Sequence, residues 1–314
     1  MDDMQTRTDH TIEAHLDGIL HDLEPRLEQK LLGTVADLMA GSFEDVLREL
    51  LHNARRAGAT RIDITTLHPT EGEEYWGRAL ARNPRVNAST RVVIVTDNGH
   101  GIIDPTAVLR YGSSCWLTSP DEADPKEPCA GVGLLAGANG PMVITTRPAK
   151  DTGVPDTPWC VMMGPKNFRG QCRTVRFLDR LAPKPHGTSV SIVADGVKEW
   201  ALEDLVRFFP VPVRINDRDI PQTLPLDGAT RTFEHEGAVI GLFEGPRQGE
   251  PSGLIYWNGT TDPLHVPVET TTTVRVDASA WRQLKLTRPG YHPADDKAKR
   301  ALREVITKHA RHGG

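Results

Sequence analysis

The sequence has few of the residues that cross-link a chain, bind zinc or span a membrane. Its four cysteines form no Cys-x-x-Cys pair and have no histidine at finger spacing, which argues against a disulfide framework and a zinc site. No apolar run approaches the roughly 20 residues of a membrane-spanning helix. Residues 1–10 are acidic and polar, unlike a secretory signal. We therefore expect a cytoplasmic protein that makes no membrane contact.

The chain also lacks an excess of positive charge. Its net charge is -5, whereas a protein that mainly grips nucleic acid is usually basic or carries a basic stripe. One stretch differs, because residues 282–311 contain nine Lys and Arg against three Asp and Glu. Such a run is usually the solvated face of a helix, and a surface for phosphate or for a partner is the alternative.

The length of 314 residues is compatible with two domains, and the pattern of apolar residues predicts an α+β fold. Helices are expected at 11–33, 43–58, 199–209 and 294–310. Strands are expected at 61–66, 91–96, 142–146, 159–163, 174–178, 188–193, 211–216, 238–243, 254–257 and 273–276. Pro210 marks the expected boundary between the domains, and long polar loops are expected at 67–90 and 111–130.

Glu49 and Asn53 are the first candidate site residues. They stand four apart in the predicted helix 43–58, so their side chains lie on one face, at the edge of its apolar stripe. An amide oxygen suits Mg²⁺, and a carboxylate one turn away could deprotonate a water. Alone, such a pair is most often a solvated helix face.

Three further motifs follow in order. Asp97 ends a predicted strand and opens Asp97-Asn98-Gly99-His100-Gly101, where a carboxylate suits the amine of adenine and glycines allow close approach. Residues 131–137, Gly-Val-Gly-Leu-Leu-Ala-Gly, would open a helix whose N–H groups can face phosphate. Gly187-Thr188 opens another strand, and the threonine hydroxyl could reach the same carboxylate.

In this order the motifs resemble the GHKL ATPase superfamily, which includes DNA gyrase B, the ninety-kilodalton heat-shock chaperone, MutL and the histidine kinases. The likeness to MutL is closest in residues 49–64, ELLHNARRAGATRIDI, and residues 131–137 look more like the gyrase and chaperone form. The resemblance implies a Bergerat-fold sandwich followed by a smaller S5-like transducer domain. It implies a helical arm at 1–40, an ATP-binding domain at 41–209 and a transducer at 210–314.

The resemblance also implies a role for each matching position. Glu49 resembles the water-activating base, Asn53 the Mg²⁺ ligand and Asp97 the adenine reader, and residues 111–130 resemble the ATP lid. The nucleotide-contacting positions would be Asn53, Ala57, Asp97, Gly99, Gly101, Gly112, Gly131, Val132, Gly133 and Thr188. The expected activity is Mg²⁺-dependent ATP hydrolysis that drives lid closure and dimerisation, in a homodimer or a larger assembly, with nucleic acid as one candidate partner.

Some positions depart from the family pattern. Arg56 replaces a common acidic residue, and no lysine follows Gly112-Ser113-Ser114 in the lid. In relatives a lysine of the transducer domain reaches the γ-phosphate. The candidates for that role here are Lys285 and, second, Arg288. Two other functions remain open, a nucleotide-gated binding module with little hydrolysis and a kinase of the histidine-kinase type. Glu49 disfavours the kinase, since those enzymes carry Asn there, and His21 is poorly placed as a phospho-acceptor.

Overall fold

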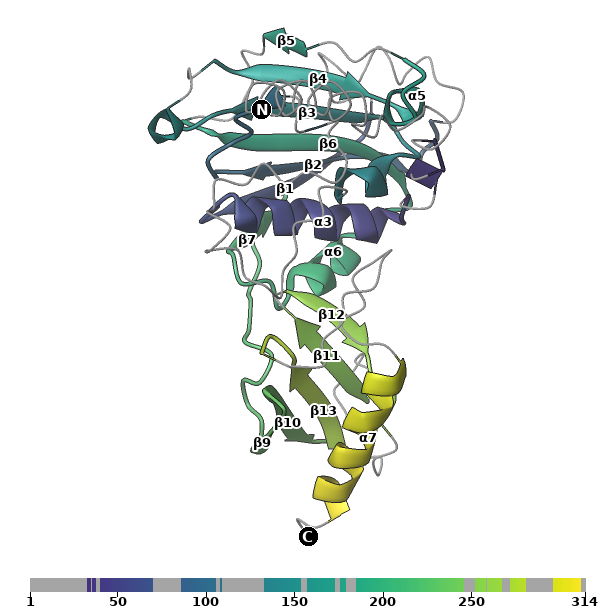
Figure 1. Ribbon diagram of the computed structural model, residues 1–314, viewed down its shortest axis with the longest axis vertical. Coiled ribbons are helices and arrows are strands. Elements are labelled where there is room, and N and C mark those ends of the chain that lie inside the picture. Colours follow the sequence, from purple (N-terminus) through teal and green to yellow (C-terminus); the bar gives the residue numbers. More distant parts are fainter. Residues whose placement is uncertain are drawn as a thin grey trace, which may run out of the picture.

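The chain forms two β-sheets, each with its own buried core (Figure 1). The computed structural model describes residues 33–34, 36–37, 40–69, 86–105, 108, 133–153, 157–172, 176–178, 185–245, 252–257, 259–266, 272–280 and 296–311. Within these residues helices and strands alternate irregularly, and both sheets mix parallel and antiparallel pairs. The predicted α+β class is confirmed.

The first sheet has eight strands among the described residues, in the order β5-β4-β3-β6-β2-β1-β7-β8. These are β1 (Ile62–Leu67), β2 (Thr90–Asp97), β3 (Met142–Arg147), β4 (Trp159–Met163), β5 (Arg176–Leu178), β6 (Gly187–Asp195), β7 (Val213–Ile215) and β8 (Arg218–Asp219). Neighbours are antiparallel except β1 and β7. The central strand β2 is buried at successive positions, Val92 and Val93, so its sequence reads as a continuous apolar run.

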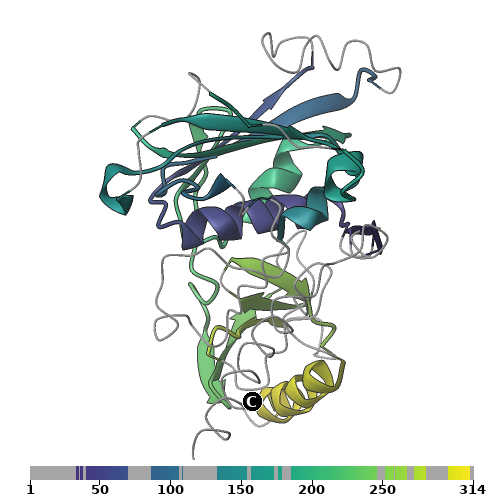
Figure 2. The ribbon, with the colours of Figure 1, turned by 45° about the horizontal axis from the view of Figure 1, so that its top comes forward.

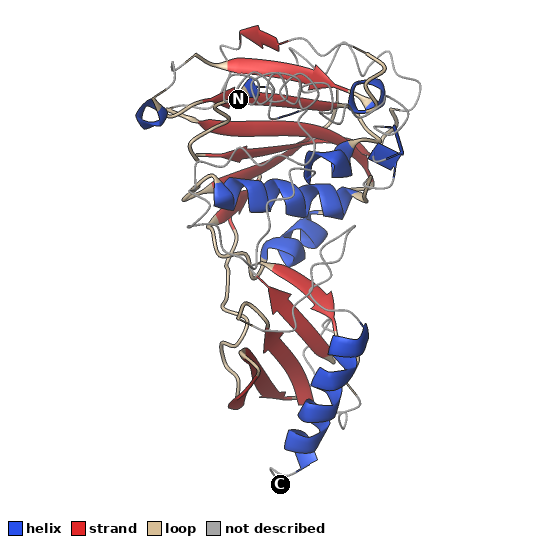
Figure 3. Ribbon diagram, in the orientation of Figure 1, coloured by secondary structure: helices blue, strands red, loops and turns tan. Residues whose placement is uncertain are grey.

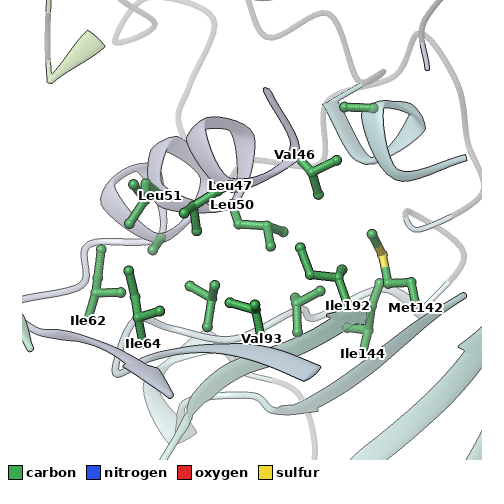
Figure 4. Packing of buried hydrophobic residues seen from close by; sticks show 14 of the residues in the cluster. Val46, Leu47, Leu50, Leu51, Ile62, Ile64, Val93, Met142, Ile144 and Ile192 are labelled. Atoms are coloured by element: carbon green, nitrogen blue, oxygen red, sulfur yellow. The ribbon is translucent and has the colours of Figure 1, made fainter. Parts of the chain in front are cut away.

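Helix α3 (Phe43–Arg56) covers one face of this sheet. Its buried apolar side chains, which recur at helical spacing, are Val46, Leu47, Leu50, Leu51 and Ala54. Figure 4 shows the valine and the three leucines packed over Ile62 and Ile64 of β1, Val93 of β2 and Ile192 of β6. Each buried leucine contributes roughly 1.5–3 kcal/mol to folding, so this packing fixes the helix to the sheet.

The second sheet has five strands among the described residues, in the order β12-β11-β13-β10-β9. They are β9 (Arg231–His235), β10 (Ala238–Glu244), β11 (Gly253–Trp257), β12 (Thr260–Pro263) and β13 (Thr272–Asp277). Helix α7 (Asp296–Arg311) lies along this sheet (Figure 3) and adds Leu302 and Ile306 to its core. The basic residues of α7 therefore flank an apolar stripe, as the solvated-face interpretation expects.

Helix α3 lies between the two sheets, with the first sheet on one side and the strands of the second beyond its other side (Figures 1 and 2). The remaining helical segments are η2 (Gly133–Gly137), η3 (Lys150–Thr152), α5 (Pro165–Phe168) and α6 (Glu199–Val206). The strands after Pro210, β7 and β8, still belong to the first sheet, and Val213 and Ile215 enter its core. The chain thus passes to the second sheet between Asp219 and Arg231. None of the described helices is long and apolar enough to cross a bilayer.

Several expected elements need correction. Helix α6 ends at Val206, three residues early, and residues 133–137 form a 3₁₀ turn instead of opening an α-helix. Strands β8, β9 and β12 were not predicted, because they are short or polar and lack an alternating apolar pattern. The predicted helix 11–33, apart from its last residue, and the loop 111–130 lie outside the described residues.

Candidate functional site

The site helix begins and ends sharply. Ser42 caps its N-terminus through a capping box, in which the Asp45 N–H donates to Ser42 Oγ and the Ser42 N–H donates to Asp45 Oδ2. At the other end, Gly58 takes a left-handed conformation with φ of +70°. Glu49 is buried and Asn53 is half-buried, one turn apart. A carboxylate and an amide oxygen are thereby held on a rigid helix fixed at both ends.

The end of β2 and the loop after it, residues 97–101, pack against the C-terminal end of α3. The His100 N–H donates to the Ala57 carbonyl at 2.9 Å, and a Cβ on Gly99 would lie 2.6 Å from that same oxygen. Gly101 has φ of +74°, and a Cβ there would lie 2.4 Å from the Arg147 carbonyl oxygen. Both glycines are therefore required by the protein's own backbone, a reason that the sequence pattern did not reveal.

The start of β6 closes on Asp97 from the other side. Asp97 accepts hydrogen bonds from the N–H groups of Gly99, at 2.8 Å, and of Thr188. The predicted contact between Asp97 and Thr188 therefore exists, but the backbone makes it. The Thr188 hydroxyl instead hydrogen-bonds the Thr146 hydroxyl at 3.1 Å. The carboxylate, the glycine loop and the Gly187-Thr188 motif thus meet at one end of the site helix.

Gly187 is the tightest point of this meeting. Its φ is +128°, and a Cβ would lie 2.0 Å from the Asp97 carbonyl oxygen. Gly187→Ala should therefore lower the free energy of unfolding strongly. The loss should exceed, by at least about 2 kcal/mol, the loss at a glycine where alanine meets no other atom and only the positive φ is unfavourable. Urea unfolding measures the difference.

Gly196, just after the same strand, provides the matched control for Gly187. Its φ is +68°, and a Cβ added there would have no atom within 4 Å. Gly196→Ala should cost only the left-handed strain of roughly 1–2 kcal/mol. Equal losses for the two variants would contradict the close approach between Gly187 and Asp97.

The environment of Asp97 raises the pKa of its carboxyl to about 6. Burial is the largest cause, and the two N–H donors together with the imidazoles of His100 and His186 work in the opposite direction. A carboxylate held near its protonation point inside a polar loop is a frequent property of binding sites. At neutral pH it is ionised and accepts hydrogen bonds only.

His186 belongs to the site, although no sequence motif singled it out. Its Nδ1 lies 2.7 Å from the Gly99 carbonyl oxygen. Since that oxygen can only accept, Nδ1 carries the hydrogen. The imidazole therefore ties the glycine loop to the start of β6. A lone histidine before a Gly-Thr pair has no spacing partner, so only the structure could reveal it.

The remaining motif meets the opposite end of α3. The Gly41 N–H, just before the cap, donates to the Ala136 carbonyl of η2 at 3.0 Å, and Leu135 is fully buried. Gly133, one of the predicted phosphate-loop residues, begins η2. The other predicted lid and loop positions, Gly112, Gly131 and Val132, lie outside the described residues, as do Lys285 and Arg288.

No family model and no curated protein matches this chain. It is similar in structure to the ATPase region of Saccharomyces cerevisiae topoisomerase II bound to dexrazoxane, with a TM-score of 0.47, 10% identity, and coverage of 74% of this chain and 72% of that one. It is also similar to the ATPase and transducer domains of Balamuthia mandrillaris topoisomerase II, with a TM-score of 0.44, 12% identity, and coverage of 69% of this chain and 59% of that one. A third similar structure is the ATPase domain of Aquifex aeolicus MutL, with a TM-score of 0.42, 13% identity, and coverage of 86% of this chain and 98% of that one.

Proposed function

We propose that this protein binds Mg²⁺-ATP along α3 and hydrolyses it. One observation carries the proposal, namely the order of the motifs along a single helix. The adenine candidates Asp97 and Thr188 meet its C-terminal end, Asn53 lies in its last turn and Glu49 in its middle, and η2 with Gly133 meets its N-terminal end. This order suits a nucleotide whose base, metal-bound phosphates and terminal phosphate follow one another.

The donor set on α3 fits magnesium. Mg²⁺ takes oxygen ligands, keeps several waters and is completed by phosphate oxygens, so one protein amide oxygen from Asn53 is an adequate anchor. Bound there, the ion would neutralise charge that develops on the phosphates. The half-buried position of Asn53 leaves its side chain partly accessible, as such a ligand must be.

The presence of a glutamate at position 49 favours water as the acceptor of the phosphoryl group. A carboxylate can accept a proton from water, which an amide cannot do, so a glutamate at this position supports hydrolysis over transfer to a protein side chain. It is held one turn from Asn53, within the same rigid element. The remaining nucleotide contacts would come from Ala57, Gly99 and Gly101.

We further propose that hydrolysis drives a conformational cycle. Residues 1–40 would form an arm, the first sheet with α3 the ATP domain with its lid at 111–130, and the second sheet with α7 a transducer domain. Contacts to the γ-phosphate commonly order such segments and release them after hydrolysis. The functional unit would then be an ATP-dependent homodimer or part of a larger assembly, with nucleic acid or a protein as its client.

Steady-state ATPase rates, with and without DNA, test this function on full-length protein whose oligomeric state is measured with and without a non-hydrolysable ATP analogue. Slow, Mg²⁺-dependent turnover supports the proposal, and stimulation by DNA that disappears at high salt assigns a nucleic-acid client. Tight nucleotide binding without turnover would instead support a nucleotide-gated binding module. Absence of nucleotide binding would overturn the proposal.

The histidine that ties the glycine loop should set nucleotide affinity. In His186→Leu the donor to the Gly99 carbonyl is lost, and the affinity for ATP should fall about 2- to 13-fold, the effect of one net hydrogen bond. In His186→Asn the side-chain amide can replace Nδ1–H and should recover most of the affinity. Fluorescence titration with a labelled ATP analogue measures both.

A histidine remote from this loop provides the control. His235 lies on β9 of the second sheet, and His235→Leu should leave ATP affinity unchanged. Equal affinity of wild type and His186→Leu would show that the hydrogen bond to Gly99 has no part in nucleotide binding.

A further inference from the structure

The face of α3 that does not pack on the first sheet meets the second sheet through aromatic rings. His52 is 1% exposed, and its ring centroid lies 5.7 Å from Trp257 of β11 and 5.9 Å from Phe209. Trp257 is fully buried. The Phe209 ring is also pressed by the turn after β11, where a Cβ on Gly259 would lie 2.3 Å from it. The three rings therefore form a closely packed contact between the helix and the second sheet.

His52 acts here as a neutral ring. Burial, and next the nearby charges of Arg56, Arg55 and Arg48, lower the pKa of its imidazole to about 3. It is uncharged across the physiological range, so its contact with Trp257 is one of aromatic packing. Protonation cannot regulate it under ordinary conditions.

A second buried contact holds the sheets together beside the first. Arg275 of β13 is 2% exposed, and its guanidinium lies 4.9 Å from the ring centroids of Phe208 and of Phe243. Its Nη1 donates to the Pro225 carbonyl at 3.1 Å. Phe208 also meets Tyr256 edge to face, at 6.3 Å. The second sheet is thus joined to the first unit by a desolvated joint, to which the site helix contributes the ring of His52.

The position of His52 on the helix gives the joint a consequence. It follows Glu49 by three residues and precedes Asn53 by one, so all three occupy a single turn. Packing of the apolar stripe on the first sheet fixes α3 from one side, and the ring contact with Trp257 holds it from a second direction. Such a contact matters for catalysis because small misplacements of reacting groups can cost about 10²-fold in rate.

We propose that His52 is a positioning residue, through whose contact with Trp257 the second sheet sets the rotation of α3 and so the placement of Glu49 and Asn53. The inference rests on the proposed function for its effect on catalysis. The mechanical part concerns only α3 and the second sheet. Loosening the contact between His52 and Trp257 should therefore alter the helix even when no nucleotide is present.

Two readouts on the full-length protein test this proposal. In Trp257→Leu, hydrogen exchange at the amides of residues 49–53 should speed up in the free protein, and kcat for ATP should fall at least about tenfold, which is more than ATP affinity should weaken. Trp257→Phe keeps a ring and should restore both. A His52→Ala, Trp257→Leu double variant should be no slower than the slower single variant, because the two remove one interaction.

Phe243→Leu is the matched control, since Phe243 lies on β10 and its ring packs on Arg275 of the neighbouring strand β13. It should leave exchange in residues 49–53 and kcat unchanged. Equal effects of Phe243→Leu and Trp257→Leu, or unchanged exchange of α3 in Trp257→Leu, would overturn the positioning role. If the wild type hydrolyses no ATP, the proposed function fails. Hydrogen exchange alone then shows whether the second sheet restrains α3.

Discussion

Glu49→Ala should bind ATP with nearly unchanged affinity and lose about 10²–10⁴-fold in kcat, the usual contribution of a positioned general base. Glu49 is buried in the middle of α3, one turn from Asn53, and it supplies the only role in our proposal that acts on water. Removal of a base affects the barrier and leaves ground-state contacts intact, so kcat should fall while affinity holds. Single-turnover kinetics and equilibrium titration separate the two.

Two companion variants sharpen this test. In Asn53→Ala the affinity for Mg²⁺-ATP should fall, in contrast to Glu49→Ala, because Asn53 is the proposed metal ligand. Glu44→Ala, on the exposed first turn of the same helix, should change neither quantity. If Glu49→Ala turns ATP over at the wild-type rate, Glu49 is not the base and another group activates water.

The sequence allowed much of this site to be anticipated, because its main parts are regular. The stripe of α3 and the alternating or continuous apolar runs of β1, β2 and β6 are strong periodic signals, and the structure confirms those elements within one or two residues at each end. Asp97 ends its strand and Gly187 begins its strand, as expected. Both positions follow from where the apolar pattern stops and a turn residue stands.

Features that depend on contacts between distant segments were not predictable. His186 and His52 look like isolated histidines in the sequence, and their partners Gly99 and Trp257 are set by the fold. The role of Gly99 and Gly101 was expected to be approach to a ligand, yet the protein's own carbonyls already require them. Tertiary packing also decided that β7, after Pro210, stays in the first sheet.

Asp97→Asn should reduce ATP affinity about 10- to 100-fold, the range of a hydrogen bond to a charged group, and should reduce the preference for ATP over GTP. An ionised carboxylate only accepts, which suits the adenine amine, whereas an asparagine amide can also donate to the oxygen of guanine. Competition titrations with the two nucleotides measure the ratio. Asp195→Asn, at the far end of β6, should leave the ratio unchanged.

The pKa of Asp97 gives this substitution opposite effects on binding and on stability. Because burial raises the pKa of the folded carboxyl to about 6 from an ordinary 3.8, the ionised form destabilises the fold fully above pH 6. That cost shrinks as pH falls from 6 toward 3.8 and is absent below 3.8, where the carboxyl is protonated in both states. Asp97→Asn should therefore stabilise the protein at pH 7, by on the order of 1–3 kcal/mol, and not at pH 4.

Binding should show the complementary dependence on pH. If the carboxylate holds the adenine amine, ATP affinity of the wild type should weaken as pH falls below about 6, and this part of the pH profile should be absent in Asp97→Asn. Thermal unfolding and nucleotide titration at pH 5 and pH 7 give both quantities on the same samples. The ionised form of Asp97 would then destabilise the fold and bind the ligand. Such a combination indicates that the residue serves ligand binding and not stability. Destabilisation by Asp97→Asn at pH 7 would instead mean that Asp97 serves only to hold the Gly99 and Thr188 backbone.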